Sequence, residues 1–136
     1  MSTEEDMDEY GRDKIHYVTV DFPENQHETL ITELSNNGAD INLQDNNGWT
    51  ALHFAAQKQS VTAVKKLLEL GADLELRDAY GNTPLFRAVF CSNGDGKIIT
   101  LMLENGANPD LENEHGVSPR SLASTIANYD VEQFFK

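Results

Sequence analysis

The chain has 136 residues, a single cysteine and a net charge of −13 at pH 7, and these values exclude several classes of protein. The length corresponds to one domain, and no apolar run is long enough for a transmembrane helix. The negative charge repels nucleic acid and anionic lipid and favours a basic partner, although acidity that serves only solubility is the alternative. Cys91 cannot form an intramolecular disulfide, which fits a reducing compartment, so we predict a cytoplasmic location.

Residues 1–13 are predicted to be an acidic, disordered tail. They contain six acidic residues, one arginine and almost no large apolar side chain, so they bury too little apolar surface to fold. The stretch also lacks the hydrophobic segment of a secretory signal. The tail could steer a partner, and a merely solvated terminus is the alternative.

From residue 14 onward, one sequence pattern recurs at an almost constant interval. The stretch Gly48–Ala56 reads GWTALHFAA, the stretch Gly81–Val89 reads GNTPLFRAV, and Gly116 begins a further copy. The first two of these glycines are 33 residues apart and the second two are 35 apart. A period of this size indicates one supersecondary unit copied in series, in which each copy buries its apolar face against its neighbours.

These residues resemble the ankyrin repeat, whose signature is Thr-Pro-Leu-His near the start of the first helix. The signature appears as Thr50-Ala-Leu-His53, as Thr83-Pro-Leu-Phe86 and as Ser118-Pro-Arg-Ser121. The resemblance covers residues 14–136 and implies an all-α ankyrin-repeat solenoid of about four helix-turn-helix units with β-turn fingers. We place the units at about 14–46, 47–79, 80–114 and 115–136. The chain looks like the short, stand-alone ankyrin proteins of bacteria.

The first unit is irregular and the second is regular. His16 precedes the next Gly-Ala pair by 22 residues, whereas His53 precedes its pair by 18, so we expect extra residues near 20–25 and a second helix at about Gln26–Asn36. In the second unit, Thr50 is expected to cap the first helix. The second helix, at about 61–70, should end at Gly71.

The resemblance implies that the signature histidine, His53, hydrogen-bonds Thr50 or a neighbouring turn. It also implies that one such polar bridge is missing where Phe86 replaces histidine. The third unit also carries a flexible insertion at 92–97, which does not complete a phosphate-binding motif. In the fourth unit Arg120 fits an outward-facing cap. The final phenylalanines, 134 and 135, should close the stack, and an exposed aromatic patch for a partner is the alternative.

The resemblance also implies a partner-binding groove, which we expect to be acidic, along the loop tips and the exposed face of each first helix. The positions carried onto this sequence are Asn46, Asn47, Trp49, Gln57, Lys58, Tyr80, Asn82, Phe90, Glu114 and His115, flanked by Ala79, Cys91 and Val117. Trp49, Tyr80 and Phe90 are the leading candidates, because large aromatic residues that the repeat core does not need are typical anchors. Packing of the same rings against the adjacent finger is the alternative.

No catalytic or metal-binding pattern is evident, and we predict no enzymatic activity, no metal and no cofactor. The four histidines lack metal-ligand spacing, and no basic residue lies near Cys91 in the sequence to activate it. The basic residues form at best a small group among many acids, so nucleic-acid binding is not expected.

The sequence therefore predicts a non-catalytic protein–protein interaction module. Short bacterial ankyrin proteins are often encoded beside secreted toxins and serve as immunity proteins. The resemblance thus implies binding and inhibition of a basic protein partner, such as a cognate toxin or nuclease. A scaffold or adaptor that joins cellular proteins without inhibition is the alternative, and an enzyme is the third hypothesis. Gene neighbourhood would separate the first two.

Overall fold

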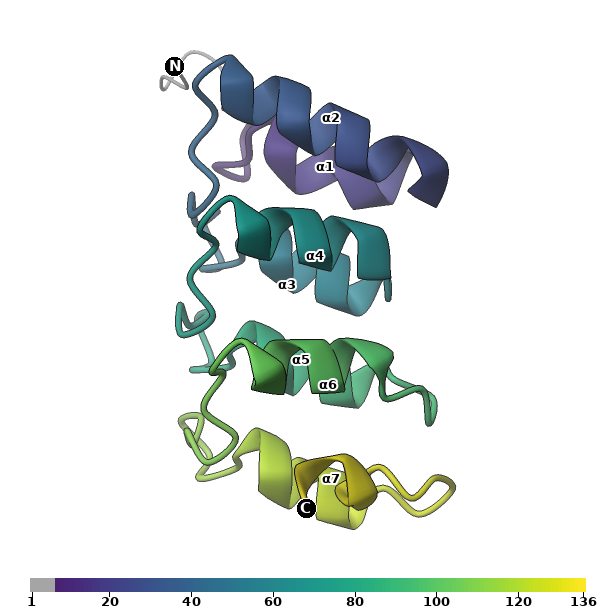
Figure 1. The fold of residues 1–136 in the computed structure, drawn as a ribbon. Helices are drawn as coiled ribbons and strands as arrows, with labels where there is room; N and C mark the ends of the chain where they lie inside the picture. Colours follow the sequence, from purple (N-terminus) through teal and green to yellow (C-terminus); the bar gives the residue numbers. More distant parts are fainter. Residues whose placement is uncertain (1–6) are drawn as a thin grey trace.

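The computed structural model describes residues 7–136 as a stack of helix pairs joined by extended loops (Figure 1). The elements in chain order are α1 (Lys14–Asp21), α2 (Glu24–Asn36), α3 (Ala51–Gln57), α4 (Val61–Glu69), α5 (Pro84–Phe90), α6 (Lys97–Glu104), α7 (Pro119–Thr125) and the 3-10 helix η2 (Glu132–Phe135). Within the described range every regular element is helical. The predicted all-α solenoid is confirmed.

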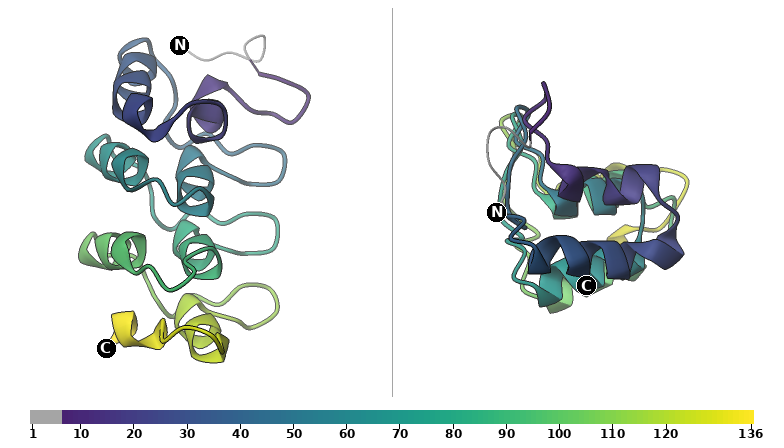
Figure 2. Two further views of the ribbon diagram at one scale, coloured as in Figure 1. Left: turned by 90° about the vertical axis from the view of Figure 1, so that its right-hand side faces the viewer. Right: turned by 90° about the horizontal axis from the view of Figure 1, so that it is seen from above.

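The helices form two layers along the stack (Figure 2). The inner layer consists of α1, α3, α5 and α7, each packed on the next, and in the outer layer α2 packs on α4 and α4 on α6. The loops between units project beside the inner layer, all to the same side. We call the surface that these loops and the inner helices share the inner face. None of the described helices is long and apolar enough to cross a bilayer.

Each projecting loop ends in a turn, or finger, that the same hydrogen bonds close. The fingers are residues 8–13, 45–50, 78–83 and 113–118. In the second finger, Oδ1 of Asp45 accepts the backbone N–H groups of Asn47 (2.9 Å) and Trp49 (2.8 Å), and the third and fourth fingers repeat this pattern. The intervening Gly48 has a φ of +79°, a conformation that glycine adopts without a steric penalty. The need for a positive φ at this position of each finger explains why glycine recurs with the period of the unit.

Residues 8–13, which the sequence assigns to the disordered tail, form the first finger in the structure. Asp8 accepts the backbone N–H of Arg12 at 3.0 Å, so this segment closes as the later fingers do. The Nε of Arg12 also donates to Asp45 in the second finger at 2.9 Å. An ion pair and backbone hydrogen bonds therefore order residues 8–13, which composition alone could not reveal. Residues 1–6 of the predicted tail lie outside the described range.

The signature histidine and the helix cap form reciprocal hydrogen bonds, as predicted for His53. The Oγ1 of Thr50 accepts the backbone N–H of His53 (3.3 Å), and Nδ1 of His53 accepts the backbone N–H of Thr50 (3.1 Å). The Nε2–H of His53 donates to the backbone oxygen of Asn82 in the next finger at 3.0 Å. In the third unit, Thr83 caps the N–H of Phe86 at 3.4 Å without the return bond. The predicted loss of the bridge is confirmed.

The core is a column of aliphatic side chains between the two layers. Ile31, Leu52, Leu67, Leu85 and Met102 come from successive helices, and each is at most 1% exposed. Burial of apolar surface therefore accumulates unit by unit along the stack. The extra residues of the first unit lengthen α2, which has 13 residues against 9 in α4.

The C-terminal segment closes the stack with η2 in place of a second full α-helix. Val131 and Phe135 are buried, and Phe134 packs on the core at partial burial. A side chain at Gly96, in the loop before α6, would overlap the ring of Phe134. The phenylalanines therefore close the stack as predicted, and they also cover the insertion of the third unit.

Arg120 occupies the position where the signature has leucine, and it faces outward as predicted. Its Nε donates to Asp110 at 2.7 Å, and its Nη1 donates to the backbone oxygen of Phe135 at 2.9 Å. The hydrogen bond from Arg120 lowers the pKa of the Asp110 carboxyl. A charged residue is acceptable here because no further unit stacks on α7 in the described chain.

Candidate functional site

The inner face contains a hollow of about 380 Å³ between the second and third fingers. Three fingers and two inner helices supply its lining, which consists of Arg12, Asn47, Trp49, Phe54, Gln57, Asp78, Tyr80 and Arg87. Asn47, Trp49, Gln57 and Tyr80 belong to the predicted partner-binding set. The stacking of units thus brings residues from three repeats into one concave site.

Trp49 forms a wall of the hollow and also packs against its neighbours. Its ring centroid lies 4.9 Å from that of Phe54 and 5.6 Å from that of His53. The guanidinium carbon of Arg87, on α5, lies 4.9 Å from the Trp49 centroid, within the range of a cation–π contact. These contacts are with α3 and α5 and not with the adjacent finger, so replacement of Trp49 should affect stability as well as any binding.

Tyr80 and Phe90 are the open aromatic side chains of the site. Tyr80, at the tip of the third finger, is 60% exposed, and Phe90, at the end of α5, is 62% exposed. The guanidinium carbon of Arg87 lies 5.3 Å from the Phe90 centroid. Neither ring belongs to the core, so both are free to contact another molecule.

The two arginines of the hollow differ in their partners. Arg12 is paired with the fully buried side chain of Asp45. Although burial opposes the charge of Arg12, hydrogen bonds to Asp45 and Tyr17 raise the pKa of its guanidinium. Arg87, by contrast, forms no ion pair or side-chain hydrogen bond with residues 7–136, and its Nε is buried without a partner.

The expectation of an acidic hollow is wrong. The finger carboxylates face the backbone: Oδ1 of Asp78 accepts the N–H groups of Tyr80 and Asn82 at 2.9 Å each. The other oxygen of Asp78, Oδ2, is buried without a partner. Exposed acids stand elsewhere, such as Glu28 on α2 and Glu69 at the end of α4. Two arginines and one aspartate line the hollow, so the formal charge of its lining is positive although the chain as a whole is acidic.

The sequence profile described as "Ankyrin repeats (3 copies)" matches residues 16–113. The chain belongs to the ankyrin-repeat family. Its fingers and inner helices are thus the elements of ankyrin repeats, a fold that by itself does not specify a partner.

The names of proteins similar to this chain refer to ankyrin repeats or to the localization of a complex. The SMC5-SMC6 complex localization factor protein 1 of Bos taurus is 31% identical over 92% of this chain. The mouse Ankyrin repeat and SOCS box protein 16 is 36% identical over 72%, and the human SH3 and multiple ankyrin repeat domains protein 2 is 38% identical over 64%. This chain spans only 12%, 22% and 5% of these proteins, respectively.

Asn82 corrects the predicted ankyrin binding set, because it is buried. Its Oδ1 accepts from Nδ2 of Asn113 in the fourth finger at 2.9 Å, and its backbone oxygen accepts from His53. The residue therefore joins α3 with the third and fourth fingers. A short amide at this place reaches the next finger, whereas Trp49 at the equivalent place of the second finger turns its ring into the hollow.

The other predicted positions lie on the inner face but outside the hollow. Asn46 is exposed and is already bound to the first finger, since its N–H donates to the backbone oxygen of Tyr10 at 2.8 Å. Lys58 is exposed at the end of α3. Glu114 and His115 are exposed at the tip of the fourth finger. Partner contact at these positions stays a prediction.

Sequence reasoning missed four residues of the hollow, namely Arg12, Phe54, Asp78 and Arg87. Arg12 had been assigned to a tail, and the others occupy repeat positions that the family signature does not mark as binding. One signal was available for the first finger: Asp8 precedes Gly11 by three residues, as Asp45 precedes Gly48. That repetition identifies the first finger from sequence.

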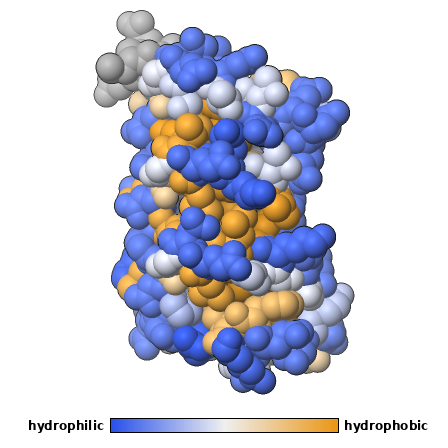
Figure 3. All heavy atoms as spheres, viewed as in Figure 1, coloured by the Kyte–Doolittle hydropathy of each residue, from blue (hydrophilic) through white to orange (hydrophobic). Residues whose placement is uncertain are grey.

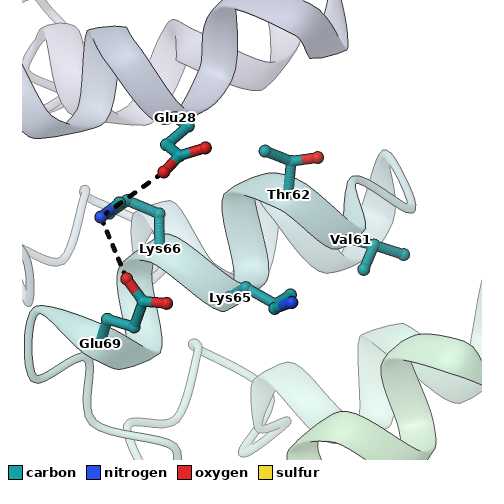
Figure 4. A pocket seen from close by; sticks show the side chains of 6 residues that line it. All are labelled: Glu28, Val61, Thr62, Lys65, Lys66 and Glu69. Atoms are coloured by element: carbon teal, nitrogen blue, oxygen red, sulfur yellow. Dashed lines mark hydrogen bonds and ion pairs between the residues drawn. The ribbon is translucent and has the colours of Figure 1, made fainter.

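A second hollow, of about 310 Å³, lies on the outer layer between α2 and α4 (Figure 4). There Nζ of Lys66 lies 3.0 Å from Glu69 and 3.8 Å from Glu28, so these charges satisfy one another. Figure 3 shows that apolar atoms of the outer layer are interrupted by hydrophilic side chains. None of the buried, unpartnered polar atoms of the described chain lies in this hollow, which therefore carries less recognition chemistry than the inner one.

The inner hollow can form hydrogen bonds, ion pairs and ring contacts. In the described range no group of three or more His, Cys, Asp or Glu residues could hold a metal ion. The chemistry of the inner hollow suits recognition, because two arginines, two amide side chains and aromatic rings line it.

His53, beside the hollow, should make stability depend on pH. Burial, which disfavours the charged imidazolium, lowers the pKa of His53 below its ordinary value of 6.5, and the hydrogen bond to the backbone of Asn82 offsets only part of this effect. A depressed folded-state pKa means that the unfolded chain binds the proton more readily, so stability is lost as pH falls through about 6.5. The melting temperature should therefore decrease between about pH 7 and 5.5.

The matched control is His53→Phe, since Phe86 stands at the equivalent place of the next unit. This variant starts less stable, but its melting temperature should change less over the same pH interval. An equal decrease in both proteins would contradict the assignment to His53.

Proposed function

We propose that this ankyrin-repeat domain is a non-catalytic module that holds a protein partner on its inner face. The observation that carries the proposal is the pair of exposed rings, Tyr80 and Phe90, beside the hollow that Arg87 and Trp49 line. Exposed aromatic side chains around a concave site are typical anchors of protein interfaces. The names of the relatives support an adaptor role, because one is a complex localization factor and two combine ankyrin repeats with other domains.

The double replacement of Tyr80 and Phe90 by alanine tests the proposal. It should weaken binding of the native partner by at least about tenfold, since removal of anchor rings costs on the order of 2 kcal/mol. The melting temperature should hardly change, because both rings are more than half exposed. Capture of the partner from native cells, followed by affinity measurement, provides the readout.

Phe22→Ala is the matched control. Phe22 is 46% exposed at the turn between α1 and α2, away from the fingers, and its loss should leave binding unchanged. Equal capture by the wild-type chain and the double variant would rule out the inner face as the interface.

Inhibition of a basic partner, such as a toxin, is the second candidate function, and the net charge of −13 supports it. The net negative charge of the chain would speed the approach of a basic protein. The association rate should then fall steeply with added salt, and the activity of the captured partner should stop when the chain is added. A partner that keeps its activity in the complex would favour the adaptor role.

A further inference from the structure

We propose that the hollow receives the carboxylate of an aspartate or glutamate side chain of the protein partner, which pairs with Arg87. The inference rests on the proposed function and specifies the chemistry of one contact. The inner face would then bind one acidic residue of the partner, while other contacts, such as those of the exposed rings, hold the rest of the partner.

The guanidinium of Arg87 lacks the partners that such a group normally has. Its Nε is buried with no hydrogen bond, and no carboxylate of residues 7–136 lies within ion-pair distance. Its two Nη atoms also form no hydrogen bond with this part of the chain, yet they are not among the buried unpartnered atoms. They are therefore accessible at the hollow that Arg87 lines. A partly buried charge without a counter-ion is costly until a partner supplies one.

The surrounding rings hold this guanidinium in place. Its carbon lies 4.9 Å from the Trp49 centroid and 5.3 Å from the Phe90 centroid. Packing of this kind restricts a long side chain before the partner arrives, which lowers the entropic cost of binding. The planar fork of an arginine matches the two oxygens of a carboxylate.

One regular side-chain contact between neighbouring fingers is missing at this place. Arg12, which follows the glycine of the first finger, donates to Asp45 of the second. At the equivalent place of the third finger, Asn82 accepts from Asn113 of the fourth. Trp49 holds this place in the second finger and makes no such bond, so Oδ2 of Asp78 stays unpartnered. The hollow occurs where this side-chain contact is missing, while the backbone N–H of Ala79 still donates to the oxygen of Asn47 at 2.8 Å and joins the two fingers.

An anion fits the hollow better than a cation does. A cationic side chain would face two guanidinium groups, and the oxygen of Asp78 that could attract it is buried. Arg12 is already neutralised by Asp45, so Arg87 is the cation that remains for a partner. The negative charge of Asp78 opposes the binding of an anion. Its removal therefore tests whether the hollow binds an anion or a cation.

The experiment selects short random displayed peptides on the full chain and measures the affinity of the enriched sequences. Aspartate or glutamate should dominate at one position of these peptides. Arg87→Gln should weaken their binding by about tenfold or more, and Arg87→Lys should restore only part of it because the fork is lost. Lys65→Gln, which removes one exposed charge from α4, should leave the affinity unchanged.

Asp78→Asn supplies a variant with the opposite expected sign. Asn113 closes the fourth finger with the same two backbone hydrogen bonds at 2.9 and 3.0 Å, so asparagine is compatible with a folded finger. Removal of the negative charge should tighten binding of the acidic peptides several-fold. Weaker binding of the peptides by Asp78→Asn would show that the hollow takes a cation.

The outcomes separate this inference from the proposed function. Enriched peptides without an acidic residue, an empty selection, or peptides that tolerate Arg87→Gln would overturn the carboxylate contact. If binding of the native partner still depends on Tyr80 and Phe90, the inner face remains the interface in each of these cases. Loss of that dependence would instead remove the proposed function.

Discussion

Alanine in place of Gly48 should destabilise the protein by about 3 kcal/mol. A Cβ at this position would lie 2.7 Å from Cα of Asp78 and 3.0 Å from the backbone oxygen of Arg77. Backbone atoms cannot rotate away as the end of a side chain can, so the second and third fingers would have to separate. The φ of +79° adds the strain of the left-handed region. Urea unfolding followed by circular dichroism would measure the loss.

Gly71→Ala isolates the part that comes from the close approach of the fingers. Gly71 has a φ of +95°, but no heavy atom lies within 4 Å of the place that a Cβ would occupy. Its replacement should therefore cost only about 1 kcal/mol, the conformational strain alone. Equal costs for the two variants would mean that contact between fingers contributes little to the stack. Separation of the fingers should also weaken binding, because Asn47 and Tyr80 stand on either side of the hollow.

Leu52→Ala should lower the free energy of unfolding by about 3 kcal/mol, through lost burial and the cavity that remains. Leu52 is 1% exposed on α3, which packs on α1, α4 and α5. A cavity in this helix therefore weakens contacts with both neighbouring units. Calorimetry should show a decrease of about 10 °C in the melting temperature.

Leu70→Ala is the control in the same unit. Leu70 is 37% exposed at the end of α4, so its truncation should cost less than about 1 kcal/mol. If the two variants had the same melting temperature, the column of buried aliphatic side chains would not be the main source of stability. The comparison holds the residue type constant and changes only its burial.

The repeat fold was predictable because each unit carries its own sequence signals for the same helix pair. Spacing, the Thr50 cap and Gly71 at the helix end agree with the structure, and local signals of this kind act within one unit. The first finger was missed for the opposite reason. Its order depends on the contact of Arg12 with Asp45 in the second finger, while its composition matches that of a disordered segment.

The site was predictable only in outline. The family pattern placed Asn47, Trp49 and Tyr80 on one face, and the structure brings them to one hollow. The family pattern could not predict that the side chain of Asn82 would bond to Asn113, because side chains at equivalent positions differ in length and direction. The prediction that the hollow is acidic was also wrong. The net charge of the chain does not say which carboxylates accept backbone N–H groups and which face a partner.

Trp49 is the only tryptophan of the chain, and it lines the hollow under the guanidinium of Arg87. Any molecule that draws Arg87 away or covers the indole would alter its ultraviolet emission. The protein therefore carries an intrinsic optical reporter of occupancy at this site, and titrations can be followed without a dye or a label.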